Sequence, residues 1–507
     1  MIDLLFAAAR RHGDAPFLVH DDAVYSFADV AAVARSGARH LAAQGVRPGD
    51  KVVIAVSNRP LFLHCWFSVL AAGAIAVPIA HDAFGESLDY VVGQSTATAL
   101  VTETGTEAAM RATLAARSVV ILAYASESDF VRRAAADADD DGTEADDRVV
   151  APSDSVAILY TSGTTGQPKG AVIPAESYRA AGRTIVDAIG IEAADRILVF
   201  LPLHHANPQM YALMSALTVG CSLVLVPRFS ASALLDQAAR HGATGFTYVG
   251  TVLTILSRVI DGPRPTTLRW CVGGGAPEPV WRDLVAKLGL RIHELYGMTE
   301  TGGVTSINGI GDARIGSVGR PRDDLEVALL DDDDRPLANG VGEIAVRPRA
   351  PWRITTGYFD KPMETAAAIA NLWFHTGDYG RFDEEGYLFF EGRKKDLIRR
   401  AGEMISPVAV ELVAARFAGV ADCAAVAVDD DIVGEEIKLV LVERGSLDCD
   451  ALLAHLRAAL PRHAMPRYLD FVDVIPKTPT EKVQRFRLKT STARLVDCKD
   501  LSRMSSA

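Results

Sequence analysis

Tyr160-Thr-Ser-Gly-Thr-Thr-Gly-Gln-Pro-Lys-Gly170 decides how this chain is interpreted, and it directly follows the apolar run 156–159. Glycines allow successive backbone N–H groups to turn toward one point, and hydroxyl side chains add uncharged donors. Lys169 adds a cation, so the loop suits a polyphosphate held at the exit of a buried strand. The stretch is not a Walker motif, because no Ser or Thr follows Lys169. By itself, it is also compatible with a flexible surface loop.

Composition limits the possible classes of protein. A chain of 507 residues, 49% hydrophobic and 23% charged, can fill more than one core and predicts more than one domain. The net charge of −12 argues against a nucleic-acid partner, although a single nucleotide needs only a local basic site. Six scattered cysteines without a CxxC pair indicate a reduced, cytoplasmic chain rather than a disulfide framework or zinc site.

Two apolar segments need an interpretation other than membrane insertion. Residues 1–12 run early into charge without a cleavage-site pattern, which favours an amphipathic opening helix over a signal peptide. Residues 61–80 are long enough to span a bilayer, but His64, Gly73 and Pro78 interrupt them. We therefore expect a buried helix followed by a strand, and no membrane association.

The order of apolar runs indicates an α/β fold. Helical periodicity at 27–42 and 61–72 alternates with short strand-like runs at 51–56 and 75–79, which predicts a largely parallel sheet covered by helices on both faces. Short strands and glycine turns over 313–347 predict a small antiparallel β-subdomain, and residues from 396 onward begin a second unit. We expect the acidic segment 137–147 to be a solvated loop and assign it no function.

Further chemistry-bearing blocks follow predicted strands. They are Leu203-His-His-Ala-Asn-Pro-Gln209, Trp270-Cys-Val-Gly-Gly-Gly-Ala-Pro277, Glu294-Leu-Tyr-Gly-Met-Thr-Glu-Thr-Gly302, Trp373-Phe-His-Thr-Gly-Asp378 and Val474-Ile-Pro-Lys-Thr-Pro-Thr-Glu-Lys-Val-Gln-Arg-Phe486. In open α/β sheets, ligands gather at the carboxyl ends of strands. Glycine-rich strand ends also allow a flat ring to lie against the backbone.

In order and spacing, these blocks resemble the adenylate-forming superfamily of acyl-CoA synthetases, non-ribosomal peptide adenylation domains and luciferases. The resemblance covers essentially the whole chain and is greatest for bacterial carnitine/crotonobetaine-type or aryl acyl-CoA ligases. It implies a large N-terminal domain, residues 1–394, of two doubly wound α/β subdomains plus the small β-subdomain. A small mobile α+β C-terminal domain, residues 395–507, would follow and turn about a hinge at Lys395.

The resemblance also assigns nucleotide-site residues. Lys482 matches the adenylation lysine, Thr299 the α-phosphate contact, and Glu300 with Thr161 the magnesium site. The remaining residues implied for the nucleotide are Ser162, Gly163, Thr164, Thr165, Gly166 and Lys169 of the loop, Gly275, Ala276, Pro277, Tyr296 and Gly297 around adenine, and Asp378 and Arg393 at the ribose. The chain departs from the family at Glu481, where the family usually has glycine.

An acyl pocket is implied as well. His205 takes the position of a pocket-edge histidine, although an ordinary histidine at a helix start is a competing interpretation. The other implied wall residues are Ala206, Asn207, Tyr248, Gly274, Leu295, Gly302 and Gly303. Polar Asn207 and Gln209 favour an aromatic or functionalised acid over a plain long chain.

The implied activity is ATP- and Mg²⁺-dependent formation of an acyl-adenylate, with AMP as product, followed by thioester formation with coenzyme A. One alternative is transfer of the acyl group to a carrier protein. Another is activation of a small acid such as nitrite for attack by an amine, and a third is a non-catalytic nucleotide-binding homologue. We expect a monomer or homodimer. In the second half-reaction, by resemblance, the small domain presents Gly402 to a pantetheine tunnel.

The first prediction tests Lys482. Replacement by Ala should abolish formation of the acyl-adenylate, because a positioned cation between two anions is worth several kcal/mol in a water-poor site. Thioester formation from a supplied acyl-adenylate should stay largely intact. Both half-reactions should be timed separately, and an equal loss in both would contradict this role for Lys482.

Overall fold

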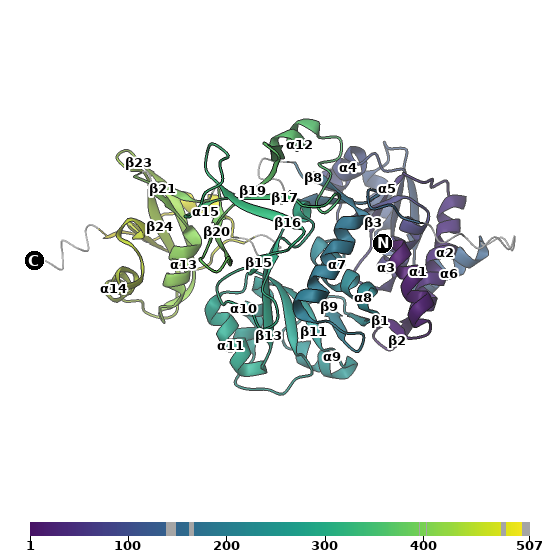
Figure 1. The fold of residues 1–507 in the computed structure, drawn as a ribbon, viewed down its shortest axis with the longest axis horizontal. Coiled ribbons are helices and arrows are strands. Elements are labelled where there is room, and N and C mark those ends of the chain that lie inside the picture. Colours follow the sequence, from purple (N-terminus) through teal and green to yellow (C-terminus); the bar gives the residue numbers. More distant parts are fainter. Residues whose placement is uncertain (138–148, 162–166, 395, 402, 478–482, 499–507) are drawn as a thin grey trace, which may run out of the picture. The chain divides into compact units, whose positions relative to one another are not determined.

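The computed structural model describes residues 1–137, 149–161, 167–394, 396–401, 403–477 and 483–498 (Figure 1). The chain divides into two compact units. The first comprises Met1–Val327 with Val346–Phe374, and the second comprises Ala328–Ala345 with His375–Ala507. The expected domain boundary between residues 394 and 395 stays a prediction.

The first unit contains a six-stranded sheet in the order β6-β5-β3-β4-β7-β8. Its neighbours pair in parallel except β7 and β8, which form an antiparallel pair. Helices α3 (Pro60–Ala71), α4 (Gly85–Gln94) and α5 (Thr104–Thr113) alternate with the strands, as predicted. The strands are β3 (Lys51–Ala55), β4 (Ile75–Pro78), β5 (Ala99–Glu103), β6 (Val120–Tyr124), β7 (Ser155–Thr161) and β8 (Lys169–Pro174).

A nine-stranded sheet completes the first unit, in the order β15-β14-β13-β12-β11-β9-β10-β1-β2. Its central strands are parallel, and β2, β14 and β15 add antiparallel edges. Its strands are β1 (Pro16–His20), β2 (Ala23–Ser26), β9 (Arg196–Val199), β10 (Ser222–Leu225), β11 (Gly245–Val249), β12 (Trp270–Gly274), β13 (Arg291–Tyr296), β14 (Ser306–Ile307) and β15 (Arg320–Pro321). Helices α9 (Leu234–His241), α10 (Gly250–Val259) and α11 (Glu278–Leu288) connect its parallel strands.

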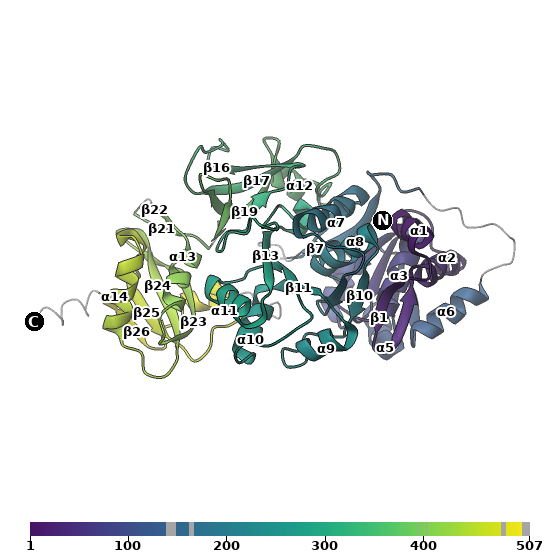
Figure 2. The same ribbon diagram turned by 60° about the horizontal axis from the view of Figure 1, so that its bottom comes forward.

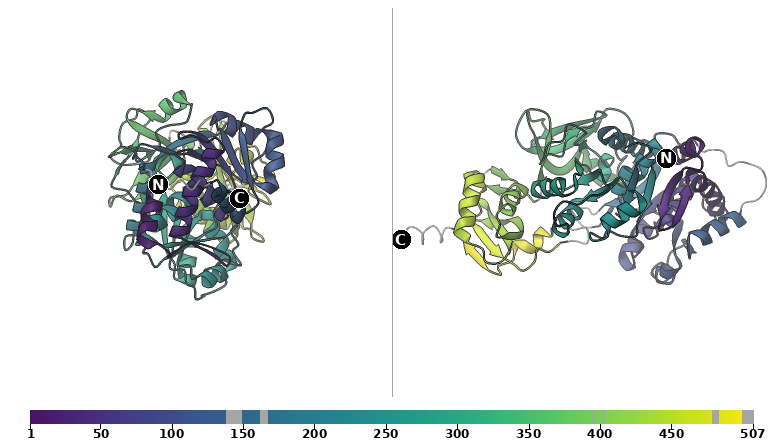
Figure 3. Two further views of the ribbon diagram at one scale, coloured as in Figure 1. Left: turned by 90° about the vertical axis from the view of Figure 1, so that its right-hand side faces the viewer. Right: turned by 90° about the horizontal axis from the view of Figure 1, so that it is seen from below.

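The N-terminal helices of this unit pack together, as Figures 2 and 3 show. They are α1 (Ile2–His12), α2 (Phe27–Ala43) and α6 (Glu127–Ala136). Helix α2 begins at a capping box, in which the Ser26 hydroxyl accepts from the Asp29 N–H and Asp29 accepts from the Ser26 N–H. The predicted opening helix is confirmed by α1, which buries Ile2, Leu5 and Phe6.

A tight helix contact positions the segment that follows β9. Helix α7 (Ala175–Ile189) lies against α8 (Met214–Val219), and Gly182 faces Met214 at the contact. The π-helix η1 (Pro208–Leu213) directly precedes α8. The Met214 N–H donates to the Gln209 carbonyl, which is the wider i to i−5 spacing. A period of 3.6 residues does not reveal such a turn.

The predicted small antiparallel sheet is present in the order β16-β17-β19-β18, with β20 paired to β19. Strands β16, β17 and β19 each contain residues of both units. The elements are β16 (Leu325–Leu330), β17 (Gly342–Pro348), α12 (Pro362–Ala368), β18 (Ile369–Ala370), β19 (Trp373–Phe382) and β20 (Leu388–Arg393).

The second unit has its own apolar core around a six-stranded sheet. The path is β22-β21-β24-β25-β26, and β23 pairs with β24. The elements are β21 (Ile398–Arg400), β22 (Glu403–Ile405), α13 (Pro407–Ala415), β23 (Val420–Asp430), β24 (Gly434–Glu443), α14 (Cys449–Ala459), β25 (Tyr468–Phe471), α15 (Arg485–Lys489) and β26 (Leu495–Asp497). The α/β fold with a smaller C-terminal α+β part is confirmed.

Two expectations from composition can be compared with these elements. None of the helices in the described part of the chain is long and apolar enough to cross a membrane. The apolar stretch 61–80 instead forms the buried helix α3 and the strand β4. The six cysteines are all free thiols.

The second prediction tests the helix contact that positions η1. A Cβ atom on Gly182 would lie 2.7 Å from Met214 Cβ and 2.9 Å from its carbonyl oxygen. Gly182→Ala should therefore lower the free energy of unfolding by about 1–3 kcal/mol through overpacking. Gly105→Ala is the control, since nothing lies within 4 Å of that position in α5, and Ala there should be neutral or slightly stabilising. Thermal or urea melts of both variants check this, and equal stability of the two would contradict it.

Candidate active site

The predicted phosphate loop joins β7 to β8 of the six-stranded sheet. Thr161 ends β7 and pairs with Lys169, which begins β8. The Thr161 hydroxyl also lies 3.5 Å from the Lys169 carbonyl oxygen. The predicted phosphate-binding residues between them, Ser162, Gly163, Thr164, Thr165 and Gly166, lie outside the described residues. The two ends of the loop are therefore in register with each other.

A buried carboxylate lies beside this loop. Glu300 belongs to the short 3₁₀ turn η2 (Thr299–Thr301) and is 3% exposed. Its Oε1 accepts from the Thr161 hydroxyl at 2.9 Å and from the Tyr358 hydroxyl at 3.1 Å. Three segments that are distant in sequence thus meet at a single carboxylate. Tyr358 was not among the residues predicted for the site.

The oxygen-rich surroundings of Glu300 fit a magnesium ion. Mg²⁺ prefers oxygen ligands and is usually held by one or two carboxylates together with substrate phosphates. Among the described residues, no basic side chain forms an ion pair with Glu300. A buried carboxylate needs a charge partner or strong donors. Glu300 and Thr161 are the residues here that could hold the ion, and their role stays a prediction; Thr299 is half-buried in the same turn.

A second buried carboxylate supports the turn that is expected to border adenine. Glu294 on β13 is 6% exposed and accepts from the N–H groups of Gly275 and Ala276. It also accepts from the Tyr248 hydroxyl at 2.5 Å. Burial, opposed by these hydrogen bonds, raises the pKa of Glu294 to about 7. Its role was not predicted, although an acidic residue next to the apolar Leu295 in a predicted strand was an available signal.

The strand ends around this turn approach one another closely. Gly275 has φ of +93°, and a Cβ on Gly250 would lie 1.9 Å from the Gly275 carbonyl oxygen. Tyr296 is 8% exposed, and a Cβ on the following Gly297 would meet the Gly303 carbonyl oxygen at 1.9 Å. The backbone can only come this close where side chains are missing. Pro277 then precedes helix α11.

The expected acyl-pocket residues form part of one connected wall. Asn207 donates from Nδ2 to the Tyr248 carbonyl at 3.0 Å, which joins the start of η1 to β11. The Tyr211 hydroxyl of η1 donates to the Gly303 carbonyl at 2.7 Å. Gly302 and Gly303 have φ of +78° and +80°, so both favour glycine. Gly274 faces the Leu295 carbonyl, from which a Cβ would be 2.9 Å away.

Two predicted wall residues differ in their exposure. Tyr248 is fully buried, and its hydroxyl donates to Glu294. The side chain therefore supports the 275–276 turn through Glu294 and does not line an open pocket. His205 is exposed, whereas the adjacent His204 is half-buried, with ring centroids 4.2 Å apart. Burial, together with His205 and His81, lowers the pKa of His204 to about 3, so this ring is neutral at pH 7. Ala206 is half-buried between them and Asn207.

The expected ribose residues lie together in the second unit. Asp378 on β19 pairs with Arg393 on β20 in the strand register, and Arg393 Nε is 3.6 Å from Asp378 Oδ1. Asp378 is 9% exposed. The structure thus brings these two residues together, while Lys395 and Lys482 lie outside the described residues.

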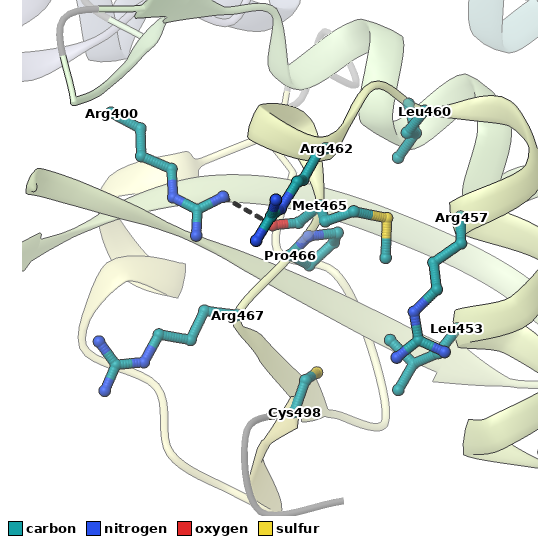
Figure 4. Close-up of a pocket in the computed structure, with 9 residues that line it drawn as sticks. All are labelled: Arg400, Leu453, Arg457, Leu460, Arg462, Met465, Pro466, Arg467 and Cys498. Atoms are coloured by element: carbon teal, nitrogen blue, oxygen red, sulfur yellow. Dashed lines mark hydrogen bonds between the residues drawn. The ribbon is translucent and has the colours of Figure 1, made fainter. Parts of the chain in front are cut away.

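A separate hollow of about 470 Å³ also lies in the second unit (Figure 4). Four arginines line it together with apolar side chains that include Leu453 and Pro466. Two of them, Arg400 and Arg467, form ion pairs with carboxylates of β23 and β24, whereas Arg457 and Arg462 are exposed. The hollow is lined by none of the site residues that the structure describes.

Comparison with known proteins identifies the family. Residues 5–359 match the family described as AMP-binding enzyme, and residues 409–482 match the AMP-binding enzyme C-terminal domain. The chain belongs to this family. The predicted resemblance to the adenylate-forming superfamily is thereby confirmed.

Relatives of this AMP-binding enzyme extend over nearly its whole length. A sulfoacetate–CoA ligase of Cupriavidus necator is 32% identical, covering 96% of both chains. An oxalate–CoA ligase of Arabidopsis thaliana is 30% identical, covering 89% of this chain and 90% of the relative. Among solved structures, ATP-bound MatB from Rhodopseudomonas palustris has a TM-score of 0.85 at 27% identity, covering 97% and 99% of the two chains.

The third prediction concerns the protonation of Glu294. Because its folded pKa of about 7 lies above the model-peptide value of 4.5, folding favours the protonated acid. The associated stability is present below about pH 4.5 and is lost as the pH rises through 7, by about 3 kcal/mol. Glu294→Gln keeps an acceptor oxygen for the two N–H groups and cannot ionise.

The variant should therefore gain stability relative to the wild type as the pH rises from 5 to 8. Melting temperatures of both proteins across this range measure the difference, and other titrating groups cancel because both proteins share them. A difference in melting temperature that does not change with pH would contradict the assigned titration.

Proposed function

We propose that this AMP-binding enzyme activates a compact, functionalised carboxylic acid as its acyl-adenylate and then forms the coenzyme A thioester. The predicted class of activity, an AMP-forming acid–thiol ligase that uses ATP, Mg²⁺ and coenzyme A, is confirmed through full-length relatives that are CoA ligases. The nature of the acid and the roles of individual residues are our proposals. We also propose a cytoplasmic location, because ATP and coenzyme A are available there.

In the first half-reaction, an oxygen of the substrate carboxylate attacks the α-phosphorus of ATP, and pyrophosphate leaves. The carboxylate is already ionised at neutral pH, so no general base is required. Two anions must approach each other, which calls for positive charge and fixed donors. We assign Lys482, Lys169 and Thr299 to this task, and Glu300 with Thr161 to holding the metal. Bound Mg²⁺ would neutralise charge on the phosphates.

Different residues are proposed to bind the adenine and the ribose of the nucleotide. We propose that Gly275, Ala276, Pro277 and Tyr296 border adenine and that Asp378 and Arg393 hold the ribose. In the second half-reaction, the thiol sulfur attacks the acyl carbonyl carbon, and AMP leaves. We propose that the C-terminal domain turns about Lys395 between the two steps.

The observation that carries the substrate proposal is the Asn207 side chain. Its Nδ2 is committed to the Tyr248 carbonyl, which also fixes the orientation of the amide. Its Oδ1 is buried and has no hydrogen-bond partner in the described part of the chain. An unmade hydrogen bond of this kind costs free energy, so a ligand that supplies a donor is favoured. A hydroxyl or amino group on the acid would do so.

Two relatives support the compact size of the acid, although not the donor group. They are named for sulfoacetate and oxalate, small acids whose second group is an anion that only accepts hydrogen bonds at neutral pH. The Met210 sulfur also lies close to Gly303, since a Cβ there would be 2.6 Å from it. We propose that this side chain limits the length of the acyl chain.

The fourth prediction is a substrate screen. Pyrophosphate release should be measured with matched acids that differ by one hydroxyl or amino group, and with unsubstituted C12–C16 fatty acids. We expect the substituted compact acids to exceed the fatty acids in kcat/KM by about 100-fold or more, because a site that hydrogen-bonds its substrate rejects analogues without that group. Asn207→Leu should reduce this preference.

Each arm of the screen should be run with coenzyme A, a carrier protein or an amine as the acceptor. Thioester formation with coenzyme A alone supports the proposal, while transfer only to a carrier or an amine supports the corresponding alternative. A clear preference for C12–C16 acids would overturn the substrate class. ATP binding without turnover of any acid would indicate a non-catalytic homologue.

A further inference from the structure

We propose that Tyr358 is a positioning residue of the nucleotide site, whose hydroxyl orients the Glu300 carboxylate toward Mg²⁺ and whose ring positions the ammonium of Lys169. The inference rests on the proposed roles of Glu300 and Lys169. Tyr358 is the residue through which these two oppositely charged groups are connected in the structure.

The first step concerns the two oxygens of Glu300. Both hydroxyl donors in the described part of the chain, from Thr161 and Tyr358, reach Oε1. The carboxylate is thus held at one oxygen, and Oε2 would be the oxygen available to a metal ion. A carboxylate held by one donor could rotate, whereas two donors from different segments fix its plane. Removing the Tyr358 hydroxyl should therefore loosen the metal ligand without removing it.

The second step concerns the phenol itself. A phenol has an ordinary pKa of about 10, so the Tyr358 hydroxyl keeps its proton at physiological pH and donates to Glu300. A hydrogen bond to a charged group is stronger than one between neutral groups, which makes this contact suited to orienting Glu300.

The third step concerns the face of the ring. Lys169 Nζ lies 5.1 Å from the centroid of the Tyr358 ring, within the range of a cation–π contact. Lysine has a long flexible side chain, so this contact limits where the ammonium can go before phosphate arrives. Tyr358 thus acts on Lys169 through its ring and on Glu300 through its hydroxyl, and the two effects can be separated by substitution.

The backbone around Tyr358 is itself held against the phosphate-loop strand. The Phe359 N–H donates to the Gly170 carbonyl at 2.8 Å, and Tyr358 forms a bridge with Ala171. On the other side, the Thr355 N–H donates to the Glu300 backbone carbonyl at 2.8 Å. The segment is therefore attached through its backbone both to β8 and to η2. These main-chain contacts fix the position from which the Tyr358 side chain extends.

Two substitutions of Tyr358 separate the effects. Tyr358→Phe removes the hydroxyl and keeps the ring, so Mg²⁺ binding to the enzyme–ATP complex should weaken by about tenfold. ATP binding in the presence of EDTA should stay as in the wild type. Tyr358→Leu removes both contacts, so ATP binding in EDTA should weaken as well. Calorimetric titrations of ATP in EDTA, and of Mg²⁺ or Mn²⁺ into the complex, provide readouts other than turnover.

Tyr124→Phe is the matched control, because that buried tyrosine hydroxyl contacts His40 at 2.7 Å on the side of α2 and α6. Its metal and ATP affinities should equal those of the wild type. Melting curves of all variants show whether they fold. If Tyr358→Leu does not fold, Tyr358→Phe decides the proposal through its metal affinity.

The outcomes separate this inference from the proposed function. Wild-type metal affinity in Tyr358→Phe, with ATP bound normally, would overturn the orienting role while leaving the function intact. Equal ATP affinity of folded Tyr358→Leu and the wild type in EDTA would overturn the role toward Lys169. If the wild-type protein itself bound no ATP, the proposed function would fail, and this inference with it.

Discussion

The buried carboxylate of Glu300 is the point at which the phosphate-loop strand, the turn η2 and the segment 355–359 are joined. None of these segments is adjacent to another in sequence. Glu300 belongs to η2, and the other two segments reach its carboxylate or its backbone carbonyl through hydrogen bonds. Taking an ionised carboxylate out of water is costly, so the arrangement is stable only while its donors are in place. The positions of the strand ends that flank the loop therefore depend on residues up to nearly two hundred positions further along the chain.

The charge balance of this region explains why a cation is required. Two carboxylates, Glu294 and Glu300, are buried near the strand ends where we place an anionic nucleotide. Glu294 accepts hydrogen bonds from two backbone N–H groups and from the Tyr248 hydroxyl. It therefore supports the 275–276 turn and is not a candidate metal ligand. Glu300 has only hydroxyl donors among the described residues, so it would repel phosphate unless a metal ion lay between them. The protein thus provides anionic ligands, and the metal makes them compatible with ATP.

Much of the fold could be predicted from the sequence, because alternating apolar runs and glycine-rich strand ends are local signals. The helices near 27–42 and 61–72 and the strands near 51–56 and 75–79 appear with bounds changed by at most one residue. The π-turn η1 could not be predicted, since it depends on the packing of Gln209 and Tyr211 rather than on periodicity.

The site also contains some residues that sequence motifs indicate and others that only the structure reveals. Thr161, Lys169 and Glu300 carry motif signals, and the structure brings Thr161 and Glu300 into contact. Tyr358 and Glu294 act through long-range contacts, with Glu300 and with the 275–276 turn respectively, which no spacing in the sequence encodes. Sequence patterns find residues that share a loop, whereas residues that arrive from another element require the three-dimensional structure. The residue-level roles otherwise stay predictions.

The π-turn at Pro208–Leu213 has a consequence for how the wall of the pocket can change. A π-turn contains one residue more than the α-turn it replaces, so side chains before and after it are out of phase by about 100°. Loss of a single residue there would restore a regular helix and rotate Asn207 and its neighbours relative to α8, while the helix contact at Gly182 stayed in place. One-residue deletions and insertions in this segment are therefore a route by which descendants of this scaffold could exchange one acid for another without rebuilding the nucleotide site.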